Sequence, residues 1–261
     1  MRRPLWLAAV FALLAVGCAA TVSDKDRAGA RIRYDMGVAA MKDGDMLGAL
    51  RELLAAVKVS PDMAMAHNAL GLVFHAIGRR EDALKHYDEA VRLAPKFSEA
   101  HNNRGVLLTD LGRYDDAILS FDLALADILY ATPSLAEGNM GWAYFKKGDL
   151  GNALQHLQNA VATNPKFCKG YAWLAEVSLD SKKPEQTVAY CRRFQKQCLD
   201  DPAIAGQVPE QFTREMSYYL GRGYLESGDE HNAREAFDAC VKGGLEDELA
   251  AKCAQLRASL E

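Results

Sequence analysis

Small residues recur along this chain at a nearly constant spacing, and this repeat restricts the possible fold more than any other feature. The first three, Gly37, Gly71 and Gly105, are separated by 34 residues, and the series continues at Gly141, Ala175 and Gly221. Two further positions repeat with them. Seven residues after each small residue comes a breaker, a position that can end a helix, at Gly44, Gly78, Gly112, Gly148, Lys182 and Gly228. Twelve residues after each comes a second small residue, at Ala49, Ala83, Ala117, Ala153, Thr187 and Ala233. A fixed period of this kind indicates an array of repeated structural units.

Each unit has the pattern of two antiparallel helices joined by a tight turn. The first small residue lets the helices approach closely, and the small residue of the second helix completes that contact. The breaker ends the first helix, where a left-handed residue is common. Proline at Pro61, Pro95 and Pro165 closes three of the units, because proline does not continue a helix interior. The sequence therefore predicts an all-α solenoid.

These marks resemble the tetratricopeptide repeat. The clearest copy is AMAHNALGLVFHAIGRREDALKHYDEAVRLAPKF, residues 64–97, with the family's residues at Leu70, Gly71, Phe74, Gly78, Ala83, Tyr87, Ala90 and Pro95. The resemblance implies an α-α superhelix of about six repeats, at residues 30–63, 64–97, 98–133, 134–167, 168–202 and 214–245. An insertion is expected at Asp200–Thr213 and a capping helix at 246–260. The family's early tryptophan is absent, and Arg33, His67, His101, Glu137, Tyr171 and Ser217 take its place.

The N-terminus has the order of a secretory signal, with Arg2 and Arg3 before an apolar stretch that ends at Gly17. As a helix that stretch would span roughly 20 Å, less than the ~30 Å of a hydrocarbon core. We therefore expect residues 1–17 to be a signal peptide. The sequence Ala15-Val16-Gly17-Cys18 resembles the bacterial lipobox, which implies lipidation at Cys18 and, with Ala19 next, sorting to the outer membrane. Ordinary cleavage after Gly17 is the alternative. Residues 18–29 would form the lipidated cysteine and its tether.

Five cysteines remain after Cys18, and a secreted protein meets an oxidising environment. Cys168 opens the first helix of repeat five and Cys198 ends its second helix, so an antiparallel pair brings them together. Cys240 and Cys253 flank the turn between the last pair and the cap. We predict disulfides Cys168–Cys198 and Cys240–Cys253, with Cys191 free and buried. The alternative is that all five are buried thiols.

The composition argues against several classes of function. The formal net charge is −4, and no basic run interleaved with aromatic residues suggests a nucleic-acid partner. Of the six histidines, His67 and His101 share one repeat position and His86 and His156 share another, so duplication accounts for them. No spacing matches a zinc site, a phosphate-binding loop or a catalytic motif. We expect no catalytic residues, no metal and no cofactor.

First helices line the concave face of a stacked array, where a partner is expected to bind. Asparagine offers both donors and acceptors to a bound backbone, and methionine and aromatic residues offer apolar contact. The predicted groove residues are Tyr34, Met41, Met65, Asn68, His75, Asn102, Asn103, Asn139, Trp142 and Phe145. Val38, Leu72, Val106, Thr109, Lys169, Tyr218 and Arg222 are expected on the same face. The alternative is that such residues pack between repeats, which we favour for Phe121 and Trp173.

A six-repeat array behind a lipobox resembles the type IV pilus biogenesis/stability family of lipoproteins. That resemblance implies a non-enzymatic pilotin, anchored through Cys18 at the periplasmic face of the outer membrane. It would bind secretin subunits and promote their insertion and oligomerisation. Two alternatives remain: a general periplasmic scaffold for another envelope complex, and a regulatory subunit of an envelope enzyme.

Overall fold

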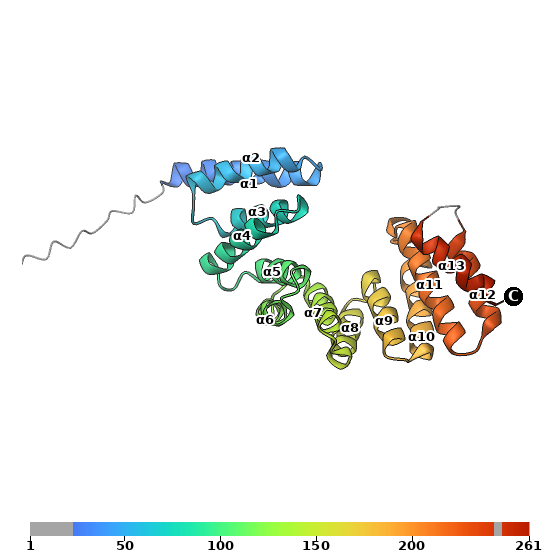
Figure 1. Cartoon of the computed structure of the whole chain (residues 1–261). Helices are drawn as coiled ribbons and strands as arrows, with labels where there is room; N and C mark the ends of the chain where they lie inside the picture. Colours follow the sequence, from blue (N-terminus) through green and yellow to red (C-terminus); the bar gives the residue numbers. More distant parts are fainter. Residues whose placement is uncertain (1–22, 243–246, 261) are drawn as a thin grey trace, which may run out of the picture.

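The computed structural model describes residues 23–242 and 247–260, and within them it is helical with no strand (Figure 1). Cys18 and the predicted signal peptide lie outside the described residues. The α-helices are α1 (Asp24–Lys42), α2 (Met46–Val59), α3 (Ala64–Ala76), α4 (Arg80–Leu93), α5 (Ser98–Asp110), α6 (Tyr114–Leu125), α7 (Pro133–Lys147), α8 (Leu150–Thr163), α9 (Cys168–Asp180), α10 (Pro184–Phe194), α11 (Glu210–Glu226), α12 (Glu230–Val241) and α13 (Glu248–Ala258). No described helix is long and apolar enough to cross a membrane.

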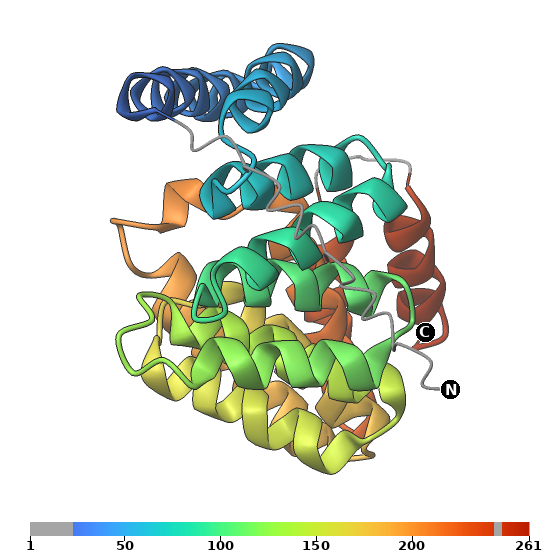
Figure 2. The ribbon, with the colours of Figure 1, turned by 90° about the vertical axis from the view of Figure 1, so that its left-hand side faces the viewer.

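Consecutive helices pack as antiparallel pairs, from α1 with α2 to α11 with α12, and α13 packs on α12. The pairs stack into an arc that descends from α1 to α8 and rises again to α13 (Figure 1). Viewed from the N-terminal end, the first pair lies above the later pairs, which overlap one another in this view (Figure 2). The predicted solenoid of six helical pairs with a capping helix is the observed fold.

Glycine allows the close approach within each pair. A Cβ added to Gly105 of α5 would lie 2.6 Å from the ring of Phe121, and one added to Gly71 of α3 would lie 2.4 Å from the ring of Tyr87. Both rings are fully buried. The six small residues on the second helices are all inaccessible to solvent as well, at Ala49, Ala83, Ala117, Ala153, Thr187 and Ala233. The spacing therefore marks the positions where the two helices meet.

The turn between paired helices has one left-handed residue in every repeat. Five are glycines with φ between 72° and 91°, at Gly44, Gly78, Gly112, Gly148 and Gly228. The sixth is Lys182, with φ 57°, the single described non-glycine residue at positive φ. The breaker position is thus structural even where the sequence departs from glycine.

The residues that replace the family's early tryptophan form hydrogen bonds to the end of the preceding repeat. The ring nitrogen Nε2 of His67 lies 3.1 Å from the carbonyl oxygen of Pro61, and Nε2 of His101 lies 2.9 Å from that of Pro95. At the same repeat position the Tyr171 hydroxyl donates to the carbonyl oxygen of Pro165 at 3.1 Å. A polar side chain at this position satisfies the carbonyl of the proline that ends the preceding repeat.

Two helices begin before the predicted boundaries. Helix α1 starts at Asp24, inside the segment 18–29 expected to be a tether, because Ser23 caps it by accepting from the Asp26 amide at 3.2 Å. Helix α11 starts at Glu210 instead of residue 214, directly after Pro209. The insertion is therefore shorter than Asp200–Thr213. It contains an irregular turn and a short 3₁₀-helix at Ala205–Gln207.

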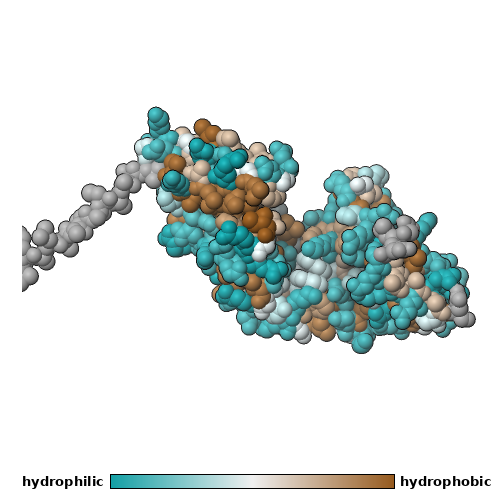
Figure 3. Space-filling view, turned by 45° about the horizontal axis from the view of Figure 1, so that its top comes forward, coloured by the Kyte–Doolittle hydropathy of each residue, from teal (hydrophilic) through white to brown (hydrophobic). Residues whose placement is uncertain are grey.

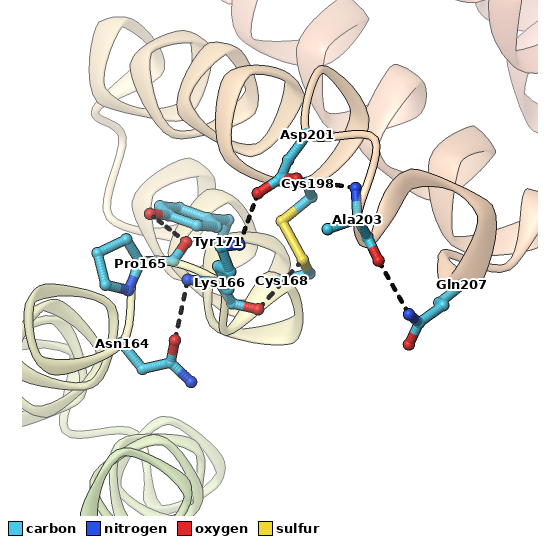
Figure 4. Close-up of polar contacts among 9 residues, drawn as sticks. All are labelled: Asn164, Pro165, Lys166, Cys168, Tyr171, Cys198, Asp201, Ala203 and Gln207. Atoms are coloured by element: carbon cyan, nitrogen blue, oxygen red, sulfur yellow. Dashed lines mark hydrogen bonds and ion pairs between the residues drawn. A yellow bond between two sulfur atoms is a disulfide. The ribbon is translucent and has the colours of Figure 1, made fainter.

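The second helix of repeat five ends irregularly. Helix α10 stops at Phe194, and a π-helical turn at Gln195–Leu199 continues it. This turn places Cys198 against Cys168 at the start of α9, where the two form a disulfide (Figure 4). Lys166 Nζ and an Asp201 carboxylate oxygen lie 2.7 Å apart beside the disulfide. The disulfide therefore fixes the chain where the insertion begins, and the ion pair connects the insertion itself to the residues just before α9.

Candidate protein-binding surface

The inner face of the arc is formed by the first helices of the repeats. Helices α3, α5, α7, α9 and α11 contact one another in series, whereas the second helices of adjacent repeats have no comparable contacts. Neighbouring elements lie closer together on the inside of a curve than on the outside, so the first helices form the concave face. All ten predicted groove residues lie on α1, α3, α5 and α7.

The predicted asparagines form a chain of side-chain amides across three first helices. Asn139 Nδ2 on α7 donates to Asn102 Oδ1 on α5 at 3.1 Å, and Asn103 Nδ2 on α5 donates to Asn68 Oδ1 on α3 at 3.1 Å. Asn102 Nδ2 lies 3.5 Å from Asn103 Oδ1 and joins the two bonds. Part of the hydrogen-bonding capacity predicted for a partner is therefore used between repeats. Asn102 is buried, with 8% of its surface exposed.

The groove residues of the first two repeats divide between the core and the surface. Tyr34 and Met41 pack against the N-terminal hydrophobic core, and Met65 is 40% exposed. His75 Nε2 of α3 lies 2.9 Å from Asp110 Oδ2 of α5, a second polar link between repeats. Hydrophobic residues gather over these N-terminal pairs (Figure 3), where the exposed ones include Ile32, Met36, Leu47, Leu54, Met65 and Leu72.

An aromatic cluster lies in the middle of the concave face. Trp142 of α7 stacks on Trp173 of α9 with ring centroids 5.1 Å apart, and Phe145 lies 5.2 Å from Trp142. Trp142 and Phe145 are half-buried, whereas Trp173 is 7% exposed. The ammonium groups of Lys146 and Lys169 lie 4.2 and 4.5 Å from the centroids of Trp142 and Trp173. The two tryptophans therefore join adjacent repeats and also present a charged, aromatic surface.

A cleft of about 520 Å³ lies farther along, between α9, the insertion and α11. Trp173 and Ala172 of α9 form one wall, and Ile204 and Val208 of the insertion form another. Phe212 at the start of α11 lies between these walls and packs edge-on against Phe194 at 5.3 Å. The lining is mostly apolar.

Two glutamates and a tyrosine, Glu176, Glu215 and Tyr219, are among the residues that line this cleft. Burial raises the pKa of Glu176 on α9, and the Tyr219 hydroxyl donates a hydrogen bond to its carboxylate, which opposes that effect. Burial also raises the pKa of Glu215 on α11. Glu215 makes no hydrogen bond or ion pair within residues 23–242 and 247–260. Its charge instead raises the pKa of Glu176 further, because like charges disfavour ionisation.

Sequence reasoning did not find this cleft. Its residues from the insertion and from the start of α11 lie where the repeat spacing expands from 34 to 46 residues. The repeat pattern predicts which residues face inward or outward only within a repeat. It therefore gives no orientation for the side chains of the insertion. The longer spacing was the available signal, because it requires extra chain to lie against the array.

The structure joins the two predicted cysteine pairs, Cys168 with Cys198 and Cys240 with Cys253. Cys191 is free and buried among the core residues of repeat five, and burial raises the pKa of its thiol. The cap is also held by an ion pair. Arg214, which is 3% exposed, binds both carboxylate oxygens of Asp247 at 2.7 and 3.0 Å and donates to the Cys240 carbonyl at 2.9 Å.

The histidines pair with neighbouring side chains. His67 Nδ1 lies 3.0 Å from His86 Nδ1, and His156 Nδ1 lies 2.8 Å from Glu137 Oε2 at the equivalent position of a later repeat. No group of three or more histidine, cysteine, aspartate or glutamate side chains among the described residues could hold a metal ion. These contacts connect the two helices of a repeat.

Comparison with solved structures places this arrangement among known proteins. PilW, described as a widely conserved type IV pilus biogenesis factor, aligns with a TM-score of 0.77 at 21% identity, over 87% of this chain and 98% of its own. Pseudomonas aeruginosa PilF aligns at 0.73 and 18% identity, over 88% and 98%. YrrB, described as a TPR protein with an unusual peptide-binding site, aligns at 0.57 and 18%, over 78% and 97%. No curated protein sequence matches the chain. At these identities the likeness shows a shared fold.

Family comparison identifies the repeats directly. Tetratricopeptide-repeat models match residues 34–96, 74–136 and 138–167, which together make up half of the chain. The matches cover the first four repeats, where the spacing is most regular. With the stacked helical pairs, the left-handed turns and the glycine contacts, they establish that the chain belongs to the tetratricopeptide-repeat family.

Proposed function

We propose that this chain is a non-enzymatic assembly factor of a type IV pilus system. In this role it binds secretin subunits in the periplasm and promotes their oligomerisation and insertion into the outer membrane. The observation that carries the proposal is the likeness to PilW and PilF, which extends over 98% of each of those chains and nearly nine-tenths of this one.

The surface chemistry is consistent with binding another protein. The concave face presents exposed apolar side chains, the Trp142–Trp173 stack with its two lysines, and the cleft beside α11. Aromatic residues in partly buried clusters dominate the energy of many protein interfaces. Such a surface is suited to recognising a polypeptide.

Attachment to the outer membrane through an acylated Cys18 completes the proposal. Stable anchoring needs more than one acyl chain, which a lipobox cysteine would carry. Cys18→Ala should abolish acyl labelling and release the protein from membranes. Ala19→Asp is the matched variant: it should keep the label but move the protein to the inner membrane. A Cys18→Ala protein that stays labelled and membrane-bound would show that the lipobox interpretation is wrong.

Deleting the gene tests the function itself. We expect secretin to be produced at normal levels but to remain monomeric, as measured by heat-resistant oligomers on denaturing gels. Complementation with the wild-type gene should restore the oligomers, and complementation with Cys18→Ala should restore few or none. Normal oligomers in the deletion strain would exclude the pilotin role. The partner would then belong to another envelope complex.

A further inference from the structure

The cleft between α9, the insertion and α11 has a specific chemical character. Its lining is mostly apolar but includes two carboxylates from successive repeats, Glu176 and Glu215. Glu176 accepts from Tyr219, while Glu215 has no hydrogen-bond or ion-pair partner among the described residues. An unneutralised carboxylate in an apolar hollow is costly, and a cation placed there relieves both the desolvation and the repulsion.

The two lysines that line the cleft do not neutralise its carboxylates. Lys166 is paired with Asp201 at 2.7 Å, and the Lys169 ammonium lies over the ring of Trp173 at 4.5 Å (Figure 4 shows the first pair). The one lysine whose charge acts on Glu176 is Lys146, whose ammonium lies over Trp142. No lysine or arginine forms an ion pair with Glu215 in the described part of the chain. The carboxylate of Glu215 thus lacks a counter-ion of its own, and the charge of Lys146 offsets only part of the desolvation of Glu176.

We propose that this cleft binds a peptide segment in which an arginine or lysine adjoins an apolar residue, the basic group lying between Glu176 and Glu215 and the apolar side chain against Trp173 and Phe212. The aliphatic stem of a basic side chain suits the apolar walls while its charged end reaches the carboxylates. The ring of Phe212 also favours a nearby cation.

This inference rests on the proposed function only in treating the chain as a protein-binding scaffold. The insertion supplies Ile204 and Val208 to the cleft, the disulfide Cys168–Cys198 holds the chain just before it against α9, and its Asp201 pairs with Lys166. The walls are therefore in place before a partner arrives. A preformed site loses less conformational entropy when a ligand binds.

A random dodecapeptide display library selected on the purified full chain tests the proposal. We expect the recovered peptides to contain arginine or lysine next to leucine, isoleucine or phenylalanine. The best peptide should bind at least about tenfold more weakly to the double variant Glu176→Gln/Glu215→Gln, because a charge-assisted contact is lost. Substituting its arginine by citrulline, which is neutral and nearly isosteric, should weaken binding to the wild type by a similar factor and leave binding to the double variant unchanged.

Glu185→Gln is the matched control, because it removes one exposed negative charge from α10 outside the cleft. It should bind like the wild type. If circular dichroism shows that the double variant is misfolded, Glu215→Gln alone is the test, since that side chain has no hydrogen bond to lose. Selection of acidic peptides, equal affinity for the double variant, or no enrichment at all would overturn the proposal. Because the measurement is made in vitro, its result stands whether or not deletion of the gene alters secretin oligomers.

Discussion

The two ends of the array are stabilised in different ways. In repeats two and three, the same contacts recur at the same repeat positions: a ring against a glycine, and a histidine on the carbonyl of the preceding proline. In the last two repeats these contacts continue, with Gly221 against the ring of Phe237 and Tyr171 donating to the Pro165 carbonyl. The disulfides Cys168–Cys198 and Cys240–Cys253 and the Arg214–Asp247 ion pair are added there, whereas the described residues of repeats one to four contain no disulfide. Where an insertion and an end interrupt the repeat, local cross-links therefore supplement neighbour packing.

The same difference separates the two kinds of surface. The regular half presents a face whose polar side chains bond between repeats, through Asn68–Asn103 and Asn102–Asn139. The irregular half contains a cleft in which one lining carboxylate, Glu215, has no such bond among the described residues. Repetition places like side chains at a fixed distance, so they can satisfy one another. An insertion breaks that register and leaves groups available for a ligand.

The largest effect should come from removing a ring in the regular half. Phe121→Ala leaves a cavity against Gly105, and we expect it to lower the free energy of unfolding by about 3–5 kcal/mol. Leu119→Ala on the same helix is the control: Leu119 is 58% exposed, and the change should stay within about 0.5 kcal/mol. Urea denaturation followed by circular dichroism measures both. Equal effects would show that Phe121 is not a packing residue.

Removing the cross-links should affect the irregular half selectively. With 30 residues between its cysteines, Cys168–Cys198 closes a longer loop than Cys240–Cys253, with 13. The loop-entropy relation gives losses of about 3.5 and about 3 kcal/mol for the two cysteine-to-serine pairs. Amide hydrogen exchange with and without reductant should show faster exchange in α9–α13 and no change in α1–α6. Faster exchange throughout would mean that the two halves unfold together.

A smaller loss is expected from the asparagine chain. Asn102→Ala leaves the Asn139 amide without its acceptor, which should lower the free energy of unfolding by about 1–3 kcal/mol with helicity retained. The double-mutant cycle with Asn139→Ala should give a coupling of at least about 0.5 kcal/mol. Strictly additive losses would indicate that the bond contributes nothing. In that case the two amides are available to a partner.

The subtlest effect is the acid sensitivity of the cap. Hydrogen bonds from Arg214 lower the pKa of Asp247 from 3.8 to about 2. The group is therefore more acidic when folded, so its contribution to stability is complete above pH 3.8 and is lost as the pH falls towards 2. Hydrogen exchange in α13 at pH 4 and pH 2.5 measures this loss, and Asp247→Asn should remove the difference that this pair makes. An unchanged pH dependence in Asp247→Asn would assign the effect to other carboxyls.

The sequence correctly predicted the helix contacts and the turns, because each of these depends on a particular kind of residue at one repeat position. Gly71 and Gly105 lie against buried rings, and the turn residues, including Lys182, have positive φ. Prediction also worked for the cysteines because the antiparallel pairing of α9 and α10 follows from the repeat. It was incomplete for the asparagines: Asn102 and Asn139 lie on the predicted helices, but their bond depends on the distance between neighbouring repeats.

By itself, the sequence determined the fold class, the number of helical pairs, the turns and the family, because these depend on spacing within a repeat. The tertiary structure alone decided which polar groups satisfy one another across repeats and which remain unpaired, and it alone placed the insertion against α9 and α11 to make a cleft. Those features depend on how neighbouring units stack and on where a segment outside the repeat lies. A pattern within one repeat does not encode the distances between side chains of different repeats, such as Glu176 and Glu215 on successive first helices.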